Sequence, residues 1–219
     1  LSLLLIAPLF FISSCEEEEE DTQSGYDCIS NTCTAIFESP QYLTLSDCQS
    51  ACADNNGGNS NLEIGDASQG GLVFYIDQTG EHGLVAAMED LEGIYQWGCY
   101  VTELTGADGT VIGTGYQNTL DIVEGCSETP IAASEALAYE SGGFDDWYLP
   151  SRDELVEMYN TIGYGGPEGN IGGFESELVY WSSSENYTYS AWFVSFSNGY
   201  AGNGTGKPNS LRVRAVRAF

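Results

Sequence analysis

The sequence has 219 residues, enough for one sizeable domain and a small appendage, and its apolar content of 42% suffices for a hydrophobic core. Its charge is strongly negative, because 33 acidic residues stand against five basic ones. Without the six acids of Glu16–Asp21 there are still 27 acids against five bases, so the globular part is itself acidic. Such a surface repels nucleic-acid phosphates and anionic lipid, and our interpretation excludes both as partners.

Residues 1–15 predict a lipoprotein signal peptide. Residues 3–12, "LLLIAPLFFI", form an apolar run of signal-peptide length that is too short to span a bilayer comfortably. The next residues, "ISSC", resemble the lipobox of bacterial lipoproteins, in which the cysteine, here Cys15, is lipidated and becomes the first mature residue. The alternative is a buried core segment, but five glutamates follow it at once. Acyl chains on Cys15 would hold the protein at a membrane.

Residues 16–25, "EEEEEDTQSG", predict an acidic linker that stays solvated. Acidic residues directly after a lipidated cysteine also resemble the surface-export signals of some Gram-negative lipoproteins. A simple spacer is the alternative. We therefore expect a protein that is lipid-anchored in the outer membrane and exposed at the cell surface.

Six cysteines remain when Cys15 is set aside, and an even number in an exported chain predicts three disulfides. These are Cys28, Cys33, Cys48, Cys52, Cys99 and Cys126. The first four fall within residues 26–52 and would stabilise a small module. Cys99 and Cys126 lie in the main domain and most simply pair with each other.

Within the small module, Thr44 or Ser46 can cap a short helix that places Cys48 and Cys52 on one face, opposite a loop from Cys28 to Cys33. The pairing among the four is left open. Zinc binding is an alternative, but the spacing and the export context speak against it.

A polar linker over residues 53–64 leads into a main domain over residues 65–219. Two short apolar runs around the turn "QTGE" predict a β-hairpin from Leu72 to Met88. Helical signals follow at residues 118–124 and 131–141 and after Ser151, and strand-like segments at residues 179–185, 190–199 and 212–219.

The third helix has the clearest start signal. In "PSRDE", Ser151 and Glu154 form a capping box, and Asp153 adds negative charge at the positive end of the helix dipole. An inward face follows at helical spacing and consists of Leu155, Met158, Tyr159 and Ile162.

Six segments of the main domain together resemble the bacterial family called the Lcl C-terminal domain, named for a collagen-like surface adhesin. They are "GGLVFYID", "EHGLVAA", "DDWYLPSRDELVEMY", "YWSSSE", "AWFVSFSNGY" and "VRAVRAF". The resemblance implies an α+β fold similar to C-type lectins and formylglycine-generating enzymes, with short antiparallel strands and about three helices. It also implies a buried Trp147.

The resemblance suggests two activities that the residues do not favour. Formylglycine-generating enzymes use a reactive cysteine pair with copper, whereas we expect Cys99 and Cys126 to be oxidised. The adhesin domain is associated with sulfated polysaccharides, which require a basic face. This chain has five bases, two of which, Arg212 and Arg214, are expected to alternate along the last strand. We expect the arginines to pair with internal carboxylates such as Asp146 or Glu185.

The sequence contains no convincing catalytic set. The single histidine, His82, falls in the predicted hairpin turn, and the hydroxyls of Ser182–Ser184 have no nearby base. Asp145 and Asp146 offer a weak calcium site at most, since two acids are too few for tight binding. We therefore expect no enzymatic activity, no cofactor and no metal centre.

Three segments rich in glycine, asparagine and tyrosine predict exposed loops, at residues 162–177, 185–190 and 198–210. Tyrosine and asparagine suit neutral sugars or protein surfaces. Alternatively these are connectors, with Tyr164 and Tyr200 packed over the core. The predicted ligand-binding residues are Tyr187, Tyr189, Asn186, Tyr200 and Asn203.

The sequence thus predicts a lipid-anchored cell-surface protein that recognises an extracellular glycan or protein without catalysis. One alternative is a structural or protein-interaction lipoprotein of the envelope. Another is a divergent enzyme of the formylglycine-generating-enzyme-like fold.

Overall fold

The computed structural model describes residues 25–29, 32–36 and 62–219. The chain divides into two compact units, Leu1–Ser60 and Asn61–Phe219, and each is described by itself. The predicted signal peptide, the acidic linker up to residue 24 and the second linker up to residue 61 lie outside the described residues, and Gly25, the last residue of the predicted acidic linker, is the first residue of a strand. Within the described part, no helix has the length and apolar character needed to span a bilayer.

The first unit contains a β-hairpin of β1 (Gly25–Ile29) and β2 (Thr32–Ile36). Cys28 and Cys33 are direct cross-strand partners in it. The prediction that Cys28 and Cys33 lie in a loop is therefore wrong, because each cysteine lies on a strand. The predicted helix carrying Cys48 and Cys52 lies outside the described residues.

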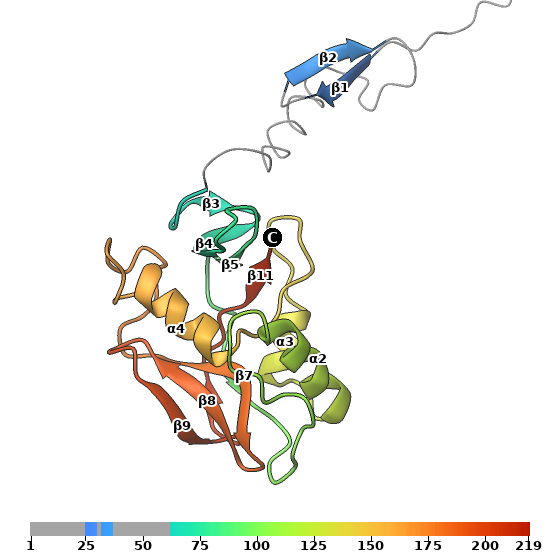
Figure 1. The fold of residues 1–219 in the computed structure, drawn as a ribbon. Coiled ribbons are helices and arrows are strands. Elements are labelled where there is room, and N and C mark those ends of the chain that lie inside the picture. The colour runs from blue at the N-terminus through green and yellow to red at the C-terminus, as the bar shows by residue number, and fades with distance from the viewer. Residues whose placement is uncertain (1–24, 30–31, 37–61) are drawn as a thin grey trace, which may run out of the picture. The chain divides into compact units, whose positions relative to one another are not determined.

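The second unit begins with a four-stranded antiparallel sheet in the order β11-β5-β4-β3 (Figure 1). Its strands are β3 (Ala67–Ser68), β4 (Gly71–Ile76), β5 (Gly83–Ala86) and β11 (Val216–Ala218). The predicted hairpin is confirmed as β4 and β5, with an irregular register between Val73 and Tyr75. The sheet joins the first and last strands of this unit.

A three-stranded antiparallel sheet forms the other sheet layer, in the order β7-β8-β9 (Figure 1). It consists of β7 (Val179–Tyr187), β8 (Ser190–Ser195) and β9 (Ala201–Gly206). Two short strands, β6 (Tyr95–Gln96) and β10 (Ser210–Leu211), pair with each other and form a separate two-stranded sheet.

Three helices are described: α2 (Gly115–Gly125), α3 (Ala132–Leu137) and α4 (Arg152–Thr161). Each was predicted, although α2 begins three residues earlier and α3 ends earlier than the sequence indicated. The mixed fold of helices with short antiparallel strands agrees with the expected α+β class.

The capping box that starts α4 is confirmed. The Glu154 amide donates to Ser151 Oγ at 3.3 Å, and the Ser151 amide donates to Glu154 Oε2 at 2.8 Å. Glu154 also accepts from the Gly113 amide at 2.8 Å, so its carboxylate joins the helix start to the segment before α2. Burial raises the pKa of this carboxyl above its ordinary value, although its backbone hydrogen bonds act in the opposite direction.

Helix α4 packs between the two sheets, since it contacts β4, β7 and β8. Its buried face contributes Leu155, Met158 and Ile162 to one core cluster. Trp147, also predicted to be buried, is fully inaccessible and lies in a second cluster beside α2 and α3.

The last predicted strand is shorter than expected. Only Val216–Ala218 is a strand, and Arg212 and Arg214 precede it. The prediction that Arg212 and Arg214 share one face of the last strand is therefore wrong. Arg212 instead forms an isolated β-bridge with Tyr180 of β7, and the chain joins β5 only after Arg214. Val216 then pairs with Ala86 of β5.

Candidate functional site: a tyrosine-rich turn and a cross-linked loop

The last residue of β7 and the turn between β7 and β8 carry two of the most exposed aromatic side chains in the described chain. Tyr187 is 66% exposed and Tyr189 is 57% exposed, whereas the strand residue Ser190 beside them is buried. Asn186 donates through Nδ2 to the backbone carbonyl of Asn203 at 2.6 Å, which ties β7 to β9. The structure therefore brings four of the five predicted binding residues to one end of this sheet.

Tyr200 does not belong to this group. The Ser195 amide donates to the Tyr200 carbonyl, so Tyr200 lies beyond the far end of β8, whereas Tyr189 directly precedes its start. Its side chain is 61% exposed with the ring 6.2 Å from that of Phe193. The alternative prediction, that the Tyr200 side chain packs over the core, is therefore wrong.

Two of the three predicted loops are largely strand. Residues 185–190 contain the end of β7 and a tight turn, and residues 198–210 contain β9. The prediction failed because glycine and asparagine are poor strand formers by propensity, whereas pairing with β8 determines the structure of these segments. The tyrosines consequently project from a paired sheet.

A buried ion pair lies beneath this turn. Lys207 Nζ is 2.5 Å from Glu185 Oε1, and both side chains are almost completely inaccessible. Lys207 also lies over the Trp97 ring, 4.5 Å from its centroid. Glu185 therefore pairs with the lysine rather than with an arginine as expected, and neither charge is available at the surface.

The same pair holds a neighbouring loop, residues 98–104. Lys207 Nζ donates to the carbonyl of Thr102 at 2.7 Å, and the Leu104 amide donates to Glu185 Oε2 at 2.9 Å. Sequence reasoning assigned no role to this loop. Its anchors are far away in the sequence and become evident only in the folded chain.

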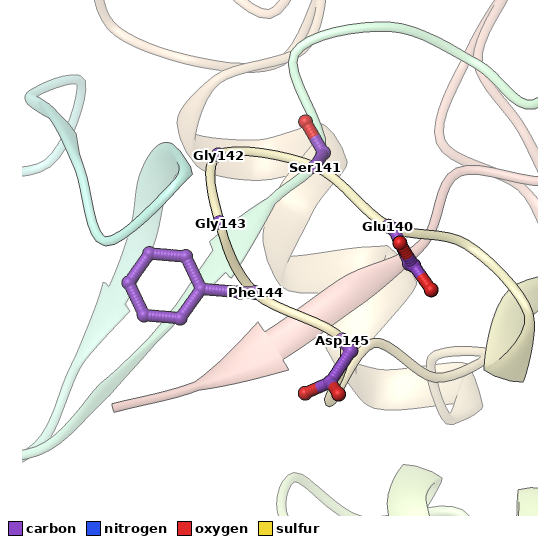
Figure 2. A pocket seen from close by; sticks show the side chains of 6 residues that line it. All are labelled: Glu140, Ser141, Gly142, Gly143, Phe144 and Asp145. Carbon is purple, nitrogen blue, oxygen red and sulfur yellow. The ribbon is translucent and has the colours of Figure 1, made fainter.

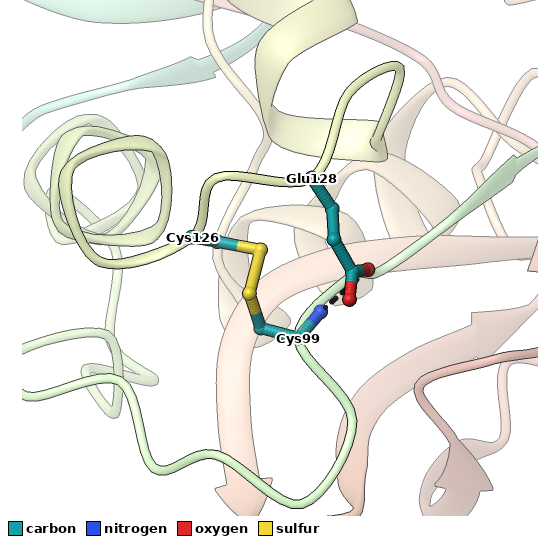
Figure 3. Close-up of side chains that lie close together, drawn as sticks. All are labelled: Cys99, Cys126 and Glu128. Carbon is teal, nitrogen blue, oxygen red and sulfur yellow. Dashed lines mark hydrogen bonds between the residues drawn. A yellow bond between two sulfur atoms is a disulfide. The ribbon is translucent and has the colours of Figure 1, made fainter.

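The predicted disulfide between Cys99 and Cys126 is confirmed, and it fixes the start of the loop (Figure 3). Figure 3 also shows the Cys99 amide donating to Glu128 Oε2, at 2.9 Å. These three residues lie close enough to suggest a metal site. Because the sulfurs are bonded to each other, they are not thiolate ligands, and the cluster serves to hold the loop.

The loop backbone is held in an uncommon conformation. Cys99 has φ 47° and Val101 has φ 63°, in the left-handed region that a β-branched residue rarely adopts. Between them, Tyr100 is 51% exposed, and Val101 itself is 63% exposed. Strained conformations that the surrounding structure enforces are often found at functional sites.

This loop and the β7–β8 turn meet through their aromatic rings. The centroids of Tyr100 and Tyr189 are 6.5 Å apart, and the planes are inclined by 59°. Two segments separated by almost ninety residues thus form one exposed tyrosine pair. We call Tyr100 and Tyr189, with their supporting loop and turn, the tyrosine-pair site.

The acidic residues before Trp147 take a different role from metal binding. Asp146 forms an ion pair with Arg217, whose guanidinium lies 3.7 Å from the centroid of the Phe144 ring. Asp145 and Glu140 line an open hollow of about 460 Å³ formed by residues 140–145, with Phe144 turned away from both carboxylates (Figure 2). The hollow contains carboxylates but no buried unpaired polar group, so it defines no specific ligand.

All five basic residues lie in the described chain, and each is engaged within it. Arg214 pairs with Asp90 at 2.6 Å, Arg152 with Asp153 at 2.7 Å, and Arg212 donates to the Gly93 carbonyl at 3.1 Å. Arg217 and Lys207 form the pairs described above. The expected pairing of the arginines with carboxylates is confirmed for Asp146.

The residues considered for catalysis do not converge. The hydroxyls of Ser182 and Ser184 donate to the backbone carbonyls of Trp192 and Gly109, at 2.9 and 2.6 Å, and both serines are buried. Ser183, also buried, accepts from the Asn118 side chain at 3.3 Å. His82 is exposed in the β4–β5 turn, where its carbonyl accepts from the Asp77 amide.

Similarity to known proteins identifies the family of the chain. No curated protein matches the chain significantly. Among solved structures, a fimbrial protein from Bacteroides ovatus ATCC 8483 is similar with 16% identity and a TM-score of 0.47, over 74% of this chain and 46% of that one. This chain therefore matches less than half of that structure. The model of the Lcl C-terminal domain matches residues 89–217, more than half of the sequence, and the chain belongs to the Lcl C-terminal domain family.

Proposed function

We propose that the protein is a lipid-anchored, cell-surface binding protein that recognises an extracellular ligand without catalysis. The observation that carries this proposal is the exposure of Tyr187 and Tyr189 at the end of a paired sheet whose base is buried. Rigid tyrosines combine a flat apolar face with a polar hydroxyl and lose little conformational entropy on binding. Asn186 and Asn203 complete the proposed contact surface.

The proposal extends to the fold and to the location of the protein. We infer a C-type-lectin-like arrangement, which rests on the family resemblance and on the small sheets around α4. We also infer a lipid anchor at Cys15 in the outer membrane, which rests on the lipobox-like sequence "ISSC" and the acidic run after it. Protease added to intact cells should then remove the domain. A domain that is cleaved only after lysis would contradict surface exposure.

The charge distribution limits the ligand class. Sulfated or otherwise anionic polysaccharides need accessible cations, whereas every lysine and arginine here is engaged with an internal acceptor. Neutral glycans and protein surfaces remain the candidate ligands. Neither a cofactor nor a tightly bound metal enters the proposal.

A glycan-array screen of residues 22–219 in oxidised form tests the proposal, with calcium in one arm and a chelator in the other. We expect specific binding that is lost on Tyr187→Ala or Tyr189→Ala and retained on Tyr200→Ala, which changes an equally exposed tyrosine at the other end of β8. Crosslinking on intact cells, followed by identification of captured proteins, covers a protein ligand. Failure of both the array and the crosslinking would overturn the binding function.

A further inference from the structure

We propose that the tyrosine-pair site binds a single neutral sugar ring, in contact with Tyr100 and Tyr189. This inference rests on the proposed function and deepens it. It adds a loop that the sequence did not indicate, and it identifies Lys207 as a residue that positions the site without touching the ligand.

The geometry of the two rings suits a flat, mostly apolar sugar face. Their planes are inclined by 59° with the centroids 6.5 Å apart, so the two rings are tilted and not stacked face to face, and about half of each side chain is accessible, 51% for Tyr100 and 57% for Tyr189. Within the described residues neither tyrosine hydroxyl donates to a protein acceptor, so both can hydrogen-bond a ligand. The C–H face of a pyranose can lie on one ring while its hydroxyls reach both phenolic groups.

The site is fixed before any ligand arrives. Tyr100 follows the disulfide at Cys99, and the carbonyl of Thr102 accepts from the buried Lys207 ammonium. Tyr189 is held by the β7–β8 turn, and its own carbonyl accepts from the Lys207 amide at 3.0 Å. One residue therefore contacts both halves of the site, through its side chain on one and its backbone on the other. Such preorganisation reduces the entropic cost of binding a small ligand.

The area that the two paired rings offer by themselves suits a small ligand, whereas a protein partner would also need their exposed neighbours Tyr187 and Val101. Fully buried aromatic side chains cover about 150–250 Å² each, so two tyrosines at 51% and 57% exposure offer roughly 200 Å². One partner of a stable protein interface contributes about 800 Å². A sugar ring can be served by the smaller area.

The surrounding charge favours a neutral ring over an acidic one. Glu103 lies in the same loop and is exposed, and Glu128 binds the loop at the Cys99 amide. The nearest cation, Lys207, is already paired with Glu185. A sulfate or uronate group would therefore face negative charge without a counterion.

The test compares tyrosine variants on neutral oligosaccharides. Maltotetraose, chitotetraose and mannotetraose serve as neutral probes after the array has ranked them, and a heparin tetrasaccharide serves as the anionic probe. Binding is measured by calorimetry or by ligand-observed NMR. We expect Tyr100→Ala and Tyr189→Ala to weaken the neutral glycan by about tenfold or more, as for a central aromatic contact. Tyr100→Phe should retain most of the affinity, and Tyr200→Ala should leave it unchanged.

Val101→Gly distinguishes the positioning of the two rings by the loop from their direct contact with the sugar. This variant keeps both rings but frees the loop backbone, and we expect it to weaken binding by several fold with no loss of thermal stability. A glycan that binds equally to wild type and Tyr100→Ala would overturn the inference while leaving the broader binding function intact. Tighter binding of the heparin probe than of the neutral probes, or the absence of any bound neutral glycan on the array, would also overturn the inference. A protein captured by crosslinking would in that case support the proposed binding function but not the sugar site.

Discussion

Lys207 and Glu185 form an ion pair from which water is almost completely excluded, with Nζ 2.5 Å from Oε1. Removing one partner leaves the other charge buried and uncompensated, which typically costs about 3–5 kcal/mol. We therefore expect Lys207→Met and Glu185→Gln each to lower the free energy of unfolding by this amount. Chemical denaturation of the oxidised domain measures it.

The double variant should cost less than the sum of the two single variants, because no charge is left unpaired. Arg152→Met is the control. Its ion pair with Asp153 is partly exposed, and we expect its loss to cost about 1 kcal/mol or less. Equal costs for Lys207→Met and Arg152→Met would show that the buried pair has no special structural importance.

The left-handed backbone at Val101 predicts that glycine is better tolerated there than valine. A non-glycine residue in this region costs about 1–3 kcal/mol, whereas glycine costs roughly 0.5–1 kcal/mol in chain entropy. Val101→Gly should therefore raise the free energy of unfolding by roughly 1 kcal/mol, a few degrees in Tm for a domain of this size. Thermal denaturation followed by circular dichroism is sufficient to detect it.

Val111→Gly provides the matched control. Val111 is similarly exposed, at 57%, but its φ is not positive. There glycine offers no relief of strain and should lower stability by roughly 0.5–1 kcal/mol through chain entropy. Two variants that shift Tm in the same direction would contradict the assignment of strain to Val101.

The Glu154 carboxylate is a third site for a stability test, because its two oxygens accept hydrogen bonds from the backbone amides of Gly113 and Ser151. A glutamine at this position must turn an NH₂ group toward one of these N–H donors. We expect Glu154→Gln to lower the free energy of unfolding by about 1–3 kcal/mol, the cost of an unsatisfied buried group. Glu157→Gln, on the same helix and half-buried, should change it by less than about 0.5 kcal/mol.

Gly115→Ala tests the same contact from the opposite side. Alanine usually stabilises a helix relative to glycine, but a Cβ at Gly115 would meet Glu154 Oε2 and come within 2.8 Å of the Ser151 amide nitrogen. We expect destabilisation. An increase in Tm would show that the Glu154 side chain can move aside without cost.

Sequence reasoning was most successful where the signal is a short spacing motif or a residue count. The start of α4 follows from the spacing of Ser151 and Glu154, and the Cys99–Cys126 disulfide follows from counting cysteines in an exported chain. The Lys207–Glu185 pair was missed because a lysine between glycine and proline predicts a solvated loop, whereas in the fold Lys207 contacts Trp97 and the Thr102 carbonyl, which are about a hundred residues away in the sequence. Tyr100 was missed because its position depends on that distant pair.

The β4–β5 turn supports a final prediction, on the pH dependence of stability. The Thr79 hydroxyl donates to Asp77 Oδ1 at 2.6 Å, and together with the amides of Thr79 and Gly80 it lowers the pKa of the Asp77 carboxyl. A carboxyl with a lowered pKa in the folded state stabilises the protein above its unfolded pKa, about 3.9. This stabilisation is lost as the pH falls through the folded pKa.

Asp77→Asn keeps an acceptor oxygen and removes the titration. The difference in Tm between wild type and this variant should therefore be constant from pH 7 to about 5 and should shrink as the pH falls below about 4. Thr79→Val removes the hydroxyl that contributes most to the pKa shift, so in that background the pH-dependent change caused by Asp77→Asn should be smaller. A difference that grows on acidification would reverse the sign of the shift and contradict the hydrogen bonding described for this turn.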